Sequence, residues 1–375
     1  MPDDAMRSLL SPVSGRGGEA MLFALLGSPM GETPSRPPAG IDVQSLFEFA
    51  FQNRVALMML ERCEDLKIPL TEAMQWEHKR LRERRRKTNA VIAKLSRALN
   101  EVAPGEWTLL KSMKPFPSTP NDTDWIPFDP ARHGELCDHL MKSGFRFLEK
   151  APLQTTLIEE SGLAVTHSDK RGGVYYIDCY KMPGADYFVY LDPAKLRGHT
   201  EIAEVDGVPT PTLEPALELV TIMIHNVFPE KTYSIETFYL IMHYLAEIER
   251  RGQRDEFIAA VRNNCCARAA SANLAVTAAL HQRHFDFVPE PLTALLTAFP
   301  SGRAEGRLLA SGERSLPYNF SNTCFWLVFV EKLRDPISIR SACVQLLHMM
   351  NPFFFFDVMR IIWKRTRGGG IYKQM

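Results

Sequence analysis

At 375 residues, with 45% hydrophobic and 23% charged residues, the chain is long enough for two or three domains with their own cores. Its 44 Lys and Arg residues balance 44 Asp and Glu residues, which argues against a protein coated in positive charge for bulk nucleic-acid binding. The start, MPDDAMRSLL, carries two aspartates where a signal peptide would be basic, and seven cysteines form no CxxC pair. We therefore expect a cytoplasmic protein with reduced thiols and no membrane partner.

The first part of the chain predicts an arm followed by helices. Residues 1–40 are rich in Gly, Pro and Ser, which indicates a flexible arm with one short helix near Ala20–Leu26. Residues 41–105 predict an N-terminal helical segment, in which a long helix runs from about Thr71 to Val102. The first half of this helix contains KRLRERRRK, which is typical of a solvated helix face; an RNA-binding surface is the alternative.

The middle of the chain, residues 106–205, predicts a sheet crossed by one helix. RHGELCDHLMKSG reads as a helix that ends near Gly144, since glycine suits the residue after a helix. The strand-like segments are EWTLLK, DTDWIPF, FRFLEK, TTLIEE, LAVTHSD, GVYYIDCYKM and DYFVYLD. Residues 206–363 predict a C-terminal helical domain, and residues 364–375 a basic, flexible tail. The expected fold class is α+β, with a small mixed-sheet core between N-terminal helices and a C-terminal helical domain.

Three aspartates in the middle segment predict a metal site. Side chains alternate between the two faces of a strand, so Asp122 and Asp124 point the same way. Asp178 lies within the apolar strand GVYYIDCYKM, where a carboxylate is costly unless it is paired or binds a metal. Carboxylates are ligands that Mg²⁺ prefers, and Mn²⁺ accepts them as well. Asp178 could complete such a site or deprotonate an acceptor hydroxyl.

The turn KSMK precedes these aspartates and could bind phosphate. Lys111 and Lys114 offer positive charge, Ser112 offers a hydroxyl, and the turn offers backbone N–H groups. Each candidate also has a structural alternative. PNDTD is a common turn sequence, Asp178 could pair with an arginine in the core, and Lys111 and Lys114 could lie at the surface. His225, on an apolar helix, could be a hydrogen-bonded core residue.

These residues together resemble the DNA polymerase beta-type nucleotidyltransferase superfamily. Its motif is an apolar residue, Gly, then Gly or Ser, a gap of about ten residues and Asp-x-Asp, with a third carboxylate on a later strand. Here LKS at 110–112, DTD at 122–124 and Asp178 occupy those places. The chain is most similar to an uncharacterised bacterial and archaeal branch, through LLK, the Gly-Phe after the middle helix, and IHNVFPEKTYSIETF with His225. The resemblance covers roughly residues 43–245.

The resemblance implies a nucleotidyltransferase core that binds an NTP and Mg²⁺ or Mn²⁺. Asp122, Asp124 and Asp178 would hold the metal and carry the catalysis, while Lys111, Ser112, Lys114 and His225 would bind the nucleotide. Lys111 stands where the motif has Gly, so phosphate contact would depend more on charge than on a close backbone approach.

The expected reaction moves an NMP from the NTP to an acceptor hydroxyl and releases pyrophosphate. A small-molecule acceptor is favoured by the neutral net charge, with tRNA or protein as alternatives. A non-catalytic nucleotide-sensing or partner-binding protein on the same fold is the competing hypothesis.

Overall fold

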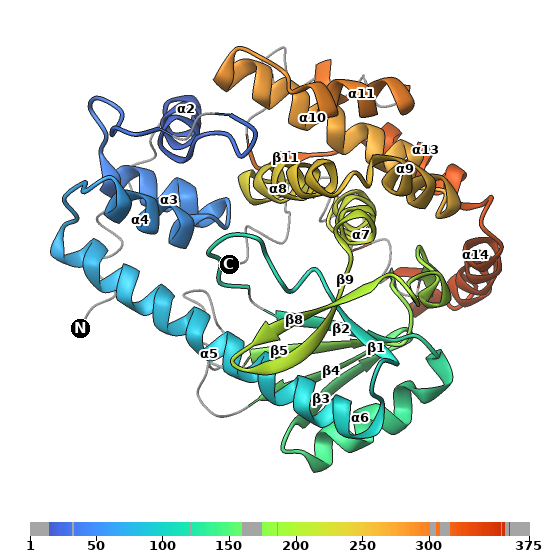
Figure 1. The fold of residues 1–375 in the computed structure, drawn as a ribbon. Helices are drawn as coiled ribbons and strands as arrows, with labels where there is room; N and C mark the ends of the chain where they lie inside the picture. The colour runs from blue at the N-terminus through green and yellow to red at the C-terminus, as the bar shows by residue number, and fades with distance from the viewer. Residues whose placement is uncertain are drawn as a thin grey trace.

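A computed structural model describes residues 15–31, 34–120, 122–159, 175–185, 187–300, 305–307, 316–353, 355, 356 and 360. Within these residues the fold is α+β, as expected: a mixed sheet lies beside a larger set of helices (Figure 1). No helix in the described part of the chain combines the length and the apolar character that crossing a membrane requires.

The main sheet has seven strands in the order β3-β4-β5-β2-β1-β9-β8. The central strand β2 runs parallel to β5 and antiparallel to β1, and β1 runs parallel to β9. The strands are β1 Trp107–Leu110, β2 Asp122–Pro127, β3 Arg146–Ala151, β4 Gln154–Glu159, β5 Tyr175–Tyr180, β8 Thr200–Val205 and β9 Val208–Leu213. Short strand pairs join β6 (Gly184–Ala185) to β7 (Phe188–Val189) and β10 (Thr232–Tyr233) to β11 (Tyr318–Asn319).

Two helices cover one face of the sheet. Helix α5 spans Glu72–Val102, and α6 spans His133–Lys142 (Figure 1). The Thr71 hydroxyl caps α5 by accepting the Met74 N–H, close to the start that the sequence predicts. Gly144 follows α6 with φ +89°, a left-handed conformation that glycine adopts without a Cβ clash. Apolar side chains of α5, α6 and the sheet form one buried cluster between them.

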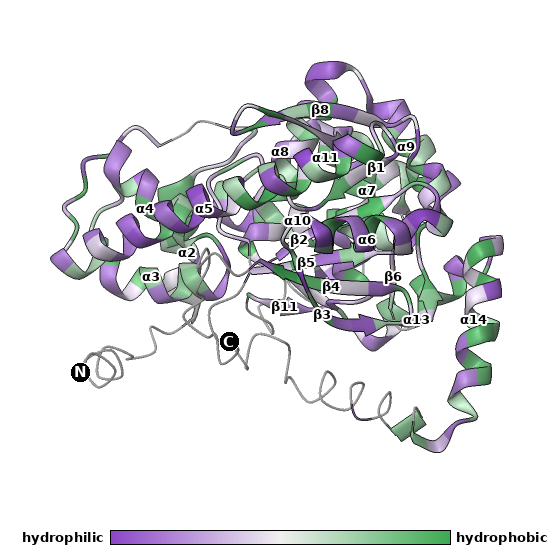
Figure 2. Cartoon of the chain, turned by 90° about the horizontal axis from the view of Figure 1, so that it is seen from below, coloured by the Kyte–Doolittle hydropathy of each residue, from purple (hydrophilic) through white to green (hydrophobic). Residues whose placement is uncertain are grey.

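The remaining helices form a second, larger core that includes the other face of the sheet. The N-terminal helices are α2 Gly15–Leu26, α3 Val43–Gln52 and α4 Ala56–Asp65. The C-terminal helices are α7 Pro215–Val227, α8 Ile235–Arg251, α9 Arg254–Asn263, α10 Ala267–Phe285, α11 Glu290–Ala298, α13 Asn322–Lys332 and α14 Pro336–Met349. Helix α14 lies at the margin of the molecule, where apolar side chains such as Leu346 and Leu347 remain exposed (Figure 2).

The expected flexible arm is wrong for the described residues of helix α2. Leu22, Phe23 and Leu25 have no exposed surface. Glu19 of the same helix pairs with His284 and Arg283 of α10, so α2 packs against a helix more than 250 residues away. The short helix expected near Ala20–Leu26 is present and begins earlier, at Gly15; the Gly- and Pro-rich composition did not predict that tertiary contacts bury it.

Two other boundaries differ from those that the sequence predicts. The sheet extends to Leu213, because β8 and β9 form a hairpin; the C-terminal helices therefore begin after residue 213 and not at 206. Helix α5 contributes to the core against the sheet, although it was expected to belong to a separate N-terminal segment. The expected strand 163–169 and the expected tail 364–375 lie outside the described residues.

Candidate metal centre

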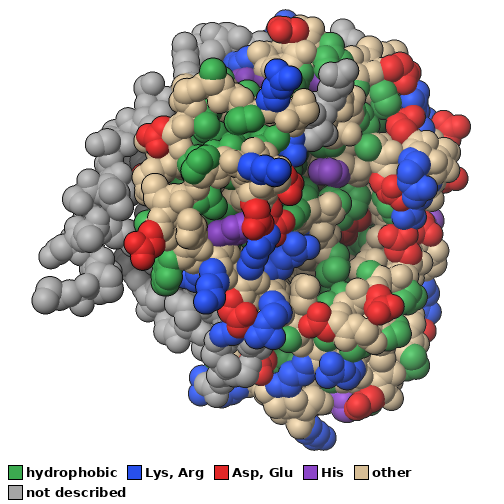
Figure 3. All heavy atoms as spheres, turned by 60° about the vertical axis from the view of Figure 1, so that its left-hand side comes forward, with side chains coloured by type: hydrophobic (Ala, Val, Ile, Leu, Met, Phe, Trp, Pro, Cys, Tyr) green, Lys and Arg blue, Asp and Glu red, His purple; other side chains and the backbone are tan. Residues whose placement is uncertain are grey.

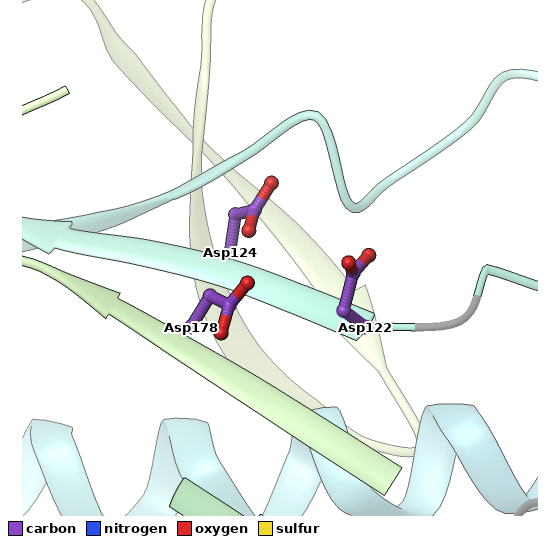
Figure 4. Close-up of side chains that lie close together, drawn as sticks. All are labelled: Asp122, Asp124 and Asp178. Atoms are coloured by element: carbon purple, nitrogen blue, oxygen red, sulfur yellow. The ribbon is translucent and has the colours of Figure 1, made fainter. Parts of the chain in front are cut away.

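The three predicted aspartates come together at the centre of the sheet. Strands β2 and β5 are parallel neighbours, and their register places Asp124 directly beside Asp178. Asp122 lies two residues before Asp124 on the same strand face. One carboxylate oxygen from each residue lies within 4.8 Å of the other two (Figure 4). The prediction that these side chains converge is confirmed.

The alternation of side chains along β2 and β5 explains this arrangement. Trp125, Ile177 and Cys179 point to the opposite face and are fully buried in the cluster with α5 and α6. Burial of these apolar side chains fixes the register of both strands, since a shift by one residue would move them out of that cluster. The aspartates are therefore held on the face that α5 and α6 do not cover (Figure 4).

Two of the three carboxylates, Asp124 and Asp178, lie in surroundings that disfavour negative charge, whereas Asp122 is exposed to solvent. Asp124 is only 7% exposed. Burial raises the pKa of its carboxyl to about 7; Lys111 lowers this pKa in part, while Asp122 and Asp178 raise it. Burial and the charge of Asp122 raise the pKa of Asp178 to about 6, although the Thr156 hydroxyl donates to its Oδ1 at 2.9 Å. A cation placed among the three oxygens would relieve this cost, and hard oxygen ligands suit Mg²⁺ or Mn²⁺.

Lys111 lies beside the aspartates. Its Nζ is 2.7 Å from Asp124 Oδ2, and its side chain is 15% exposed. Burial lowers the pKa of its ammonium, but the charge of Asp124 outweighs this and holds the pKa above its usual range. The backbone at Lys111 has φ +54°, in the region that glycine favours, which matches the Gly of the resembled motif. The alternative of a surface lysine is wrong.

Ser112 also lies at the site, but its hydroxyl is used within the protein. It accepts the backbone N–H of Asp124 at 2.9 Å and donates to the carbonyl of Leu110 at 2.9 Å. Ser112 is 7% exposed. Its observed role is to hold the turn after β1 against β2, beside the candidate metal ligand Asp124.

Lys114 finds its partner on helix α8. Its Nζ lies 2.5 Å from Glu236 Oε1, and its side chain is 10% exposed, so the alternative of a solvent-exposed lysine is wrong. Arg54, in the turn between α3 and α4, lies 3.8 Å from the other oxygen of Glu236. The structure therefore places Lys114 in an ion pair that ties the loop after β1 to α8, rather than among the aspartates.

His225 of helix α7 lies next to Lys111. Both ring nitrogens are 3.2 Å from Lys111 Nζ, and Nδ1 is 3.1 Å from the hydroxyl of Tyr190. Burial and the charge of Lys111 lower the pKa of His225 to about 4, which leaves the ring neutral at pH 7. Glu230 Oε1 lies 3.5 Å from Nε2 of His225. The prediction that His225 belongs to the site is supported by its position.

Sequence reasoning missed Glu218 and Tyr190. Glu218 of α7 is 5% exposed, and its Oε1 accepts the backbone N–H of Lys111 at 2.7 Å. Burial raises the pKa of Glu218 to about 8. A signal existed, because Glu218 and His225 are seven residues apart on one apolar helix and so share a face. Tyr190 carried no comparable signal.

The arginine-rich half of α5 does not form one open basic surface. Arg82 pairs with Glu61 and Glu64, and Arg86 with Glu83. Arg84 is 6% exposed and donates to the carbonyl of Pro120. On the face of the molecule seen in Figure 3, basic and acidic side chains alternate. This arrangement favours the expected solvated helix face over an RNA-binding surface.

No family model matches the chain, and comparisons with curated proteins and with solved structures gave no significant match. The functional conclusion therefore depends on the chemistry of the site.

Proposed function

We propose that this chain is a Mg²⁺-dependent nucleotidyltransferase that moves an NMP from an NTP to an acceptor hydroxyl. The observation that carries the proposal is the convergence of three carboxylates, within 4.8 Å, on a sheet face with too little positive charge to balance them. Asp122 is exposed, but Asp124 and Asp178 are largely removed from solvent, where a carboxylate is costly unless it is paired or binds a metal. Mg²⁺, with Mn²⁺ as a substitute, fits the oxygen donors.

In the proposed reaction the acceptor oxygen attacks the α-phosphorus, and the bond to the β-phosphate breaks to release pyrophosphate. Asp122 and Asp124 would hold the metal, which supplies positive charge to the phosphates. Asp178 would either complete the metal site or accept the proton of the acceptor hydroxyl; with a pKa of about 6 in the absence of metal, its carboxyl is largely ionised at pH 7. Lys111, with neutral His225 behind it, would bind the phosphates, and Ser112 would shape the turn.

Charge favours a small-molecule acceptor over tRNA. The chain has no net charge, and Arg82 and Arg86 of α5 are held in ion pairs. All seven cysteines are free thiols, which favours the reducing environment of the cytoplasm as the location. Nucleotide transfer to a protein side chain is an alternative that uses the same site.

The main competing function is nucleotide sensing without turnover. The observation that favours it is the ion pair between Lys111 and Asp124, in which a side chain of the protein occupies one potential metal ligand. A sensor would bind Mg²⁺ and an NTP but release no pyrophosphate in any acceptor screen.

The decisive experiment measures binding of ATP, GTP, CTP and UTP by calorimetry, with and without Mg²⁺. The double variant Asp122→Asn/Asp124→Asn is compared with the wild type. Asp206→Asn, in the β8–β9 turn at the edge of the sheet, is the matched control; its φ of +47° also suits asparagine. Metal-dependent binding of one NTP, lost only in the double variant, supports the proposal. Binding that is unchanged in the double variant contradicts it.

A further inference from the structure

Lys111 is positioned as the counter-ion of the acidic site. Its Nζ contacts Asp124 at 2.7 Å and lies 5.6 Å above the ring of Tyr180, which belongs to the same face of β5 as Asp178. Within the described residues, no other ion pair involves any of the three aspartates. In the described part of the chain, one ammonium thus faces three carboxylates, of which Asp124 is buried, Asp178 is partly buried and Asp122 is exposed.

The backbone holds Lys111 in this place. The residue adopts φ +54°, a conformation that costs a lysine about 1 kcal/mol or more. Its backbone N–H donates to Glu218, a buried carboxylate on α7. A lysine therefore adopts a backbone conformation that glycine would adopt more easily, and the hydrogen bond to Glu218 stabilises it.

A metal ion and the Lys111 ammonium would compete for the same oxygen. Mg²⁺ binds carboxylate oxygens at about 2.0–2.1 Å. With Lys111 Nζ 2.7 Å from Asp124 Oδ2, both cations would lie within a few ångströms of each other and repel. An ammonium displaced from Asp124 has another partner nearby. The neutral ring of His225 is 3.2 Å away, and Glu230 lies on the far side of that ring.

We propose that Lys111 acts as an internal cation that a metal ion must displace from Asp124, and that the phosphates of a nucleotide then receive its ammonium. This inference rests on the proposed function. Its consequence is a thermodynamic coupling, since metal and nucleoside triphosphate each bind more tightly when the other is bound. Metal alone binds weakly, because no phosphate compensates the displaced lysine.

The first test measures Mn²⁺ affinity without nucleotide, by electron paramagnetic resonance at pH 8. Lys111→Met removes the competing charge and keeps an aliphatic chain over Tyr180. Lys94→Met is the matched control, because Lys94 also pairs with a buried carboxylate, Glu159 at 3.0 Å, but on the face covered by α5. We expect Mn²⁺ to bind Lys111→Met at least about tenfold more tightly than the wild type, and Lys94→Met to equal the wild type.

Equal or weaker Mn²⁺ binding by Lys111→Met overturns the inference. If that binding is nevertheless lost in Asp124→Asn, the metal site of the proposed function stands. If neither the wild type nor Lys111→Met binds Mn²⁺ at millimolar concentration, the proposed function fails together with the inference. Lys111→Gly, which suits the positive φ, replaces Lys111→Met if circular dichroism shows that the latter does not fold.

The second test measures the coupling itself. Mn²⁺ titrations are repeated with the α,β-methylene analogue of each of the four NTPs, which cannot transfer the nucleotide. In the wild type the analogue that binds should raise Mn²⁺ affinity about tenfold more than it does in Lys111→Met. An equal increase in both proteins would show that Lys111 does not couple the two ligands.

Discussion

The sheet carries a lysine–carboxylate pair on each of its faces, and the two pairs differ in their surroundings. On the face covered by α5, Lys94 lies 3.0 Å from Glu159 and also donates to the carbonyl of Gly144. On the other face, Lys111 lies 2.7 Å from Asp124, but Asp122 and Asp178 share the same space.

The first pair matches one positive with one negative charge, whereas the second has one positive charge for three carboxylates. A buried carboxylate without a counter-charge lowers the stability of a fold, and this cost applies to buried Asp124 and partly buried Asp178 rather than to exposed Asp122. The metal ion that we propose would supply positive charge on this face only, and four predictions follow from the contrast between the two pairs.

The largest expected effect is a difference in NTP binding between variants of Asp124 and of Glu159. Asp124→Asn should weaken Mg²⁺-dependent NTP binding at least about a thousandfold, or about 4 kcal/mol, because the amide cannot replace a charged metal ligand. Glu159→Gln, in the balanced pair, should leave that binding within about twofold of the wild type. Calorimetry of both variants tests this difference, and a comparable loss in Glu159→Gln would show that the contrast has no functional meaning.

The second effect concerns stability. Lys94→Met leaves the Glu159 carboxylate, which is 5% exposed, without its ammonium. We expect the free energy of unfolding to fall by about 2 kcal/mol, less than for a fully buried pair, because the Lys94 side chain is 34% exposed. Urea denaturation followed by circular dichroism measures this change. An unchanged midpoint would mean that solvent already screens the pair.

The third effect is a pH dependence confined to the unbalanced site. Protons compete with the metal below the pKa of each ligand, and these values are about 7 for Asp124 and about 6 for Asp178. Metal affinity should therefore rise with pH, and between pH 8 and pH 6 it should fall about twentyfold. Mn²⁺ titrations across this range test the slope. Calorimetry in two buffers of different ionisation enthalpy should detect proton release at pH 6.5, and its absence would contradict the raised pKa values.

The smallest effect is a gain in stability. Asp122→Asn removes one of three like charges, so the metal-free protein should become more stable by up to about 1 kcal/mol at pH 8. The sign follows from linkage. The folded protein retains protons on Asp124 and Asp178 that the unfolded chain releases near pH 4, so metal-free stability falls as pH rises from about 4 to 7. A loss of stability in Asp122→Asn would show that the aspartates do not repel one another.

Local sequence patterns determined much of the fold around the site. The helix that starts near Thr71 and the glycine after α6 could both be predicted, because each depends on neighbouring residues. The alternation along a strand also placed Asp122 and Asp124 on one face, since a period of two is a property of any strand.

The partners of these residues were decided by tertiary structure. No local pattern shows that β2 and β5 are parallel neighbours with Asp124 beside Asp178, because that register is fixed by burial of Trp125 and Cys179 against α5 and α6. The burial of helix α2 could not be predicted for the same reason, since its buried face is covered by segments far along the chain.

The sequence by itself therefore determined the three aspartates, the Lys111 turn and the strand face that carries Asp122 and Asp124, but not the contributions of Glu218 and Tyr190. It did not determine their electrostatics. Lys111 contacts Asp124 through the pairing of β1 with β2, and it contacts His225 because α7, which begins more than 100 residues later, packs over the turn, where Glu218 accepts the Lys111 N–H. A charge's energy depends on every neighbour within a few ångströms, and only the folded chain selects those neighbours.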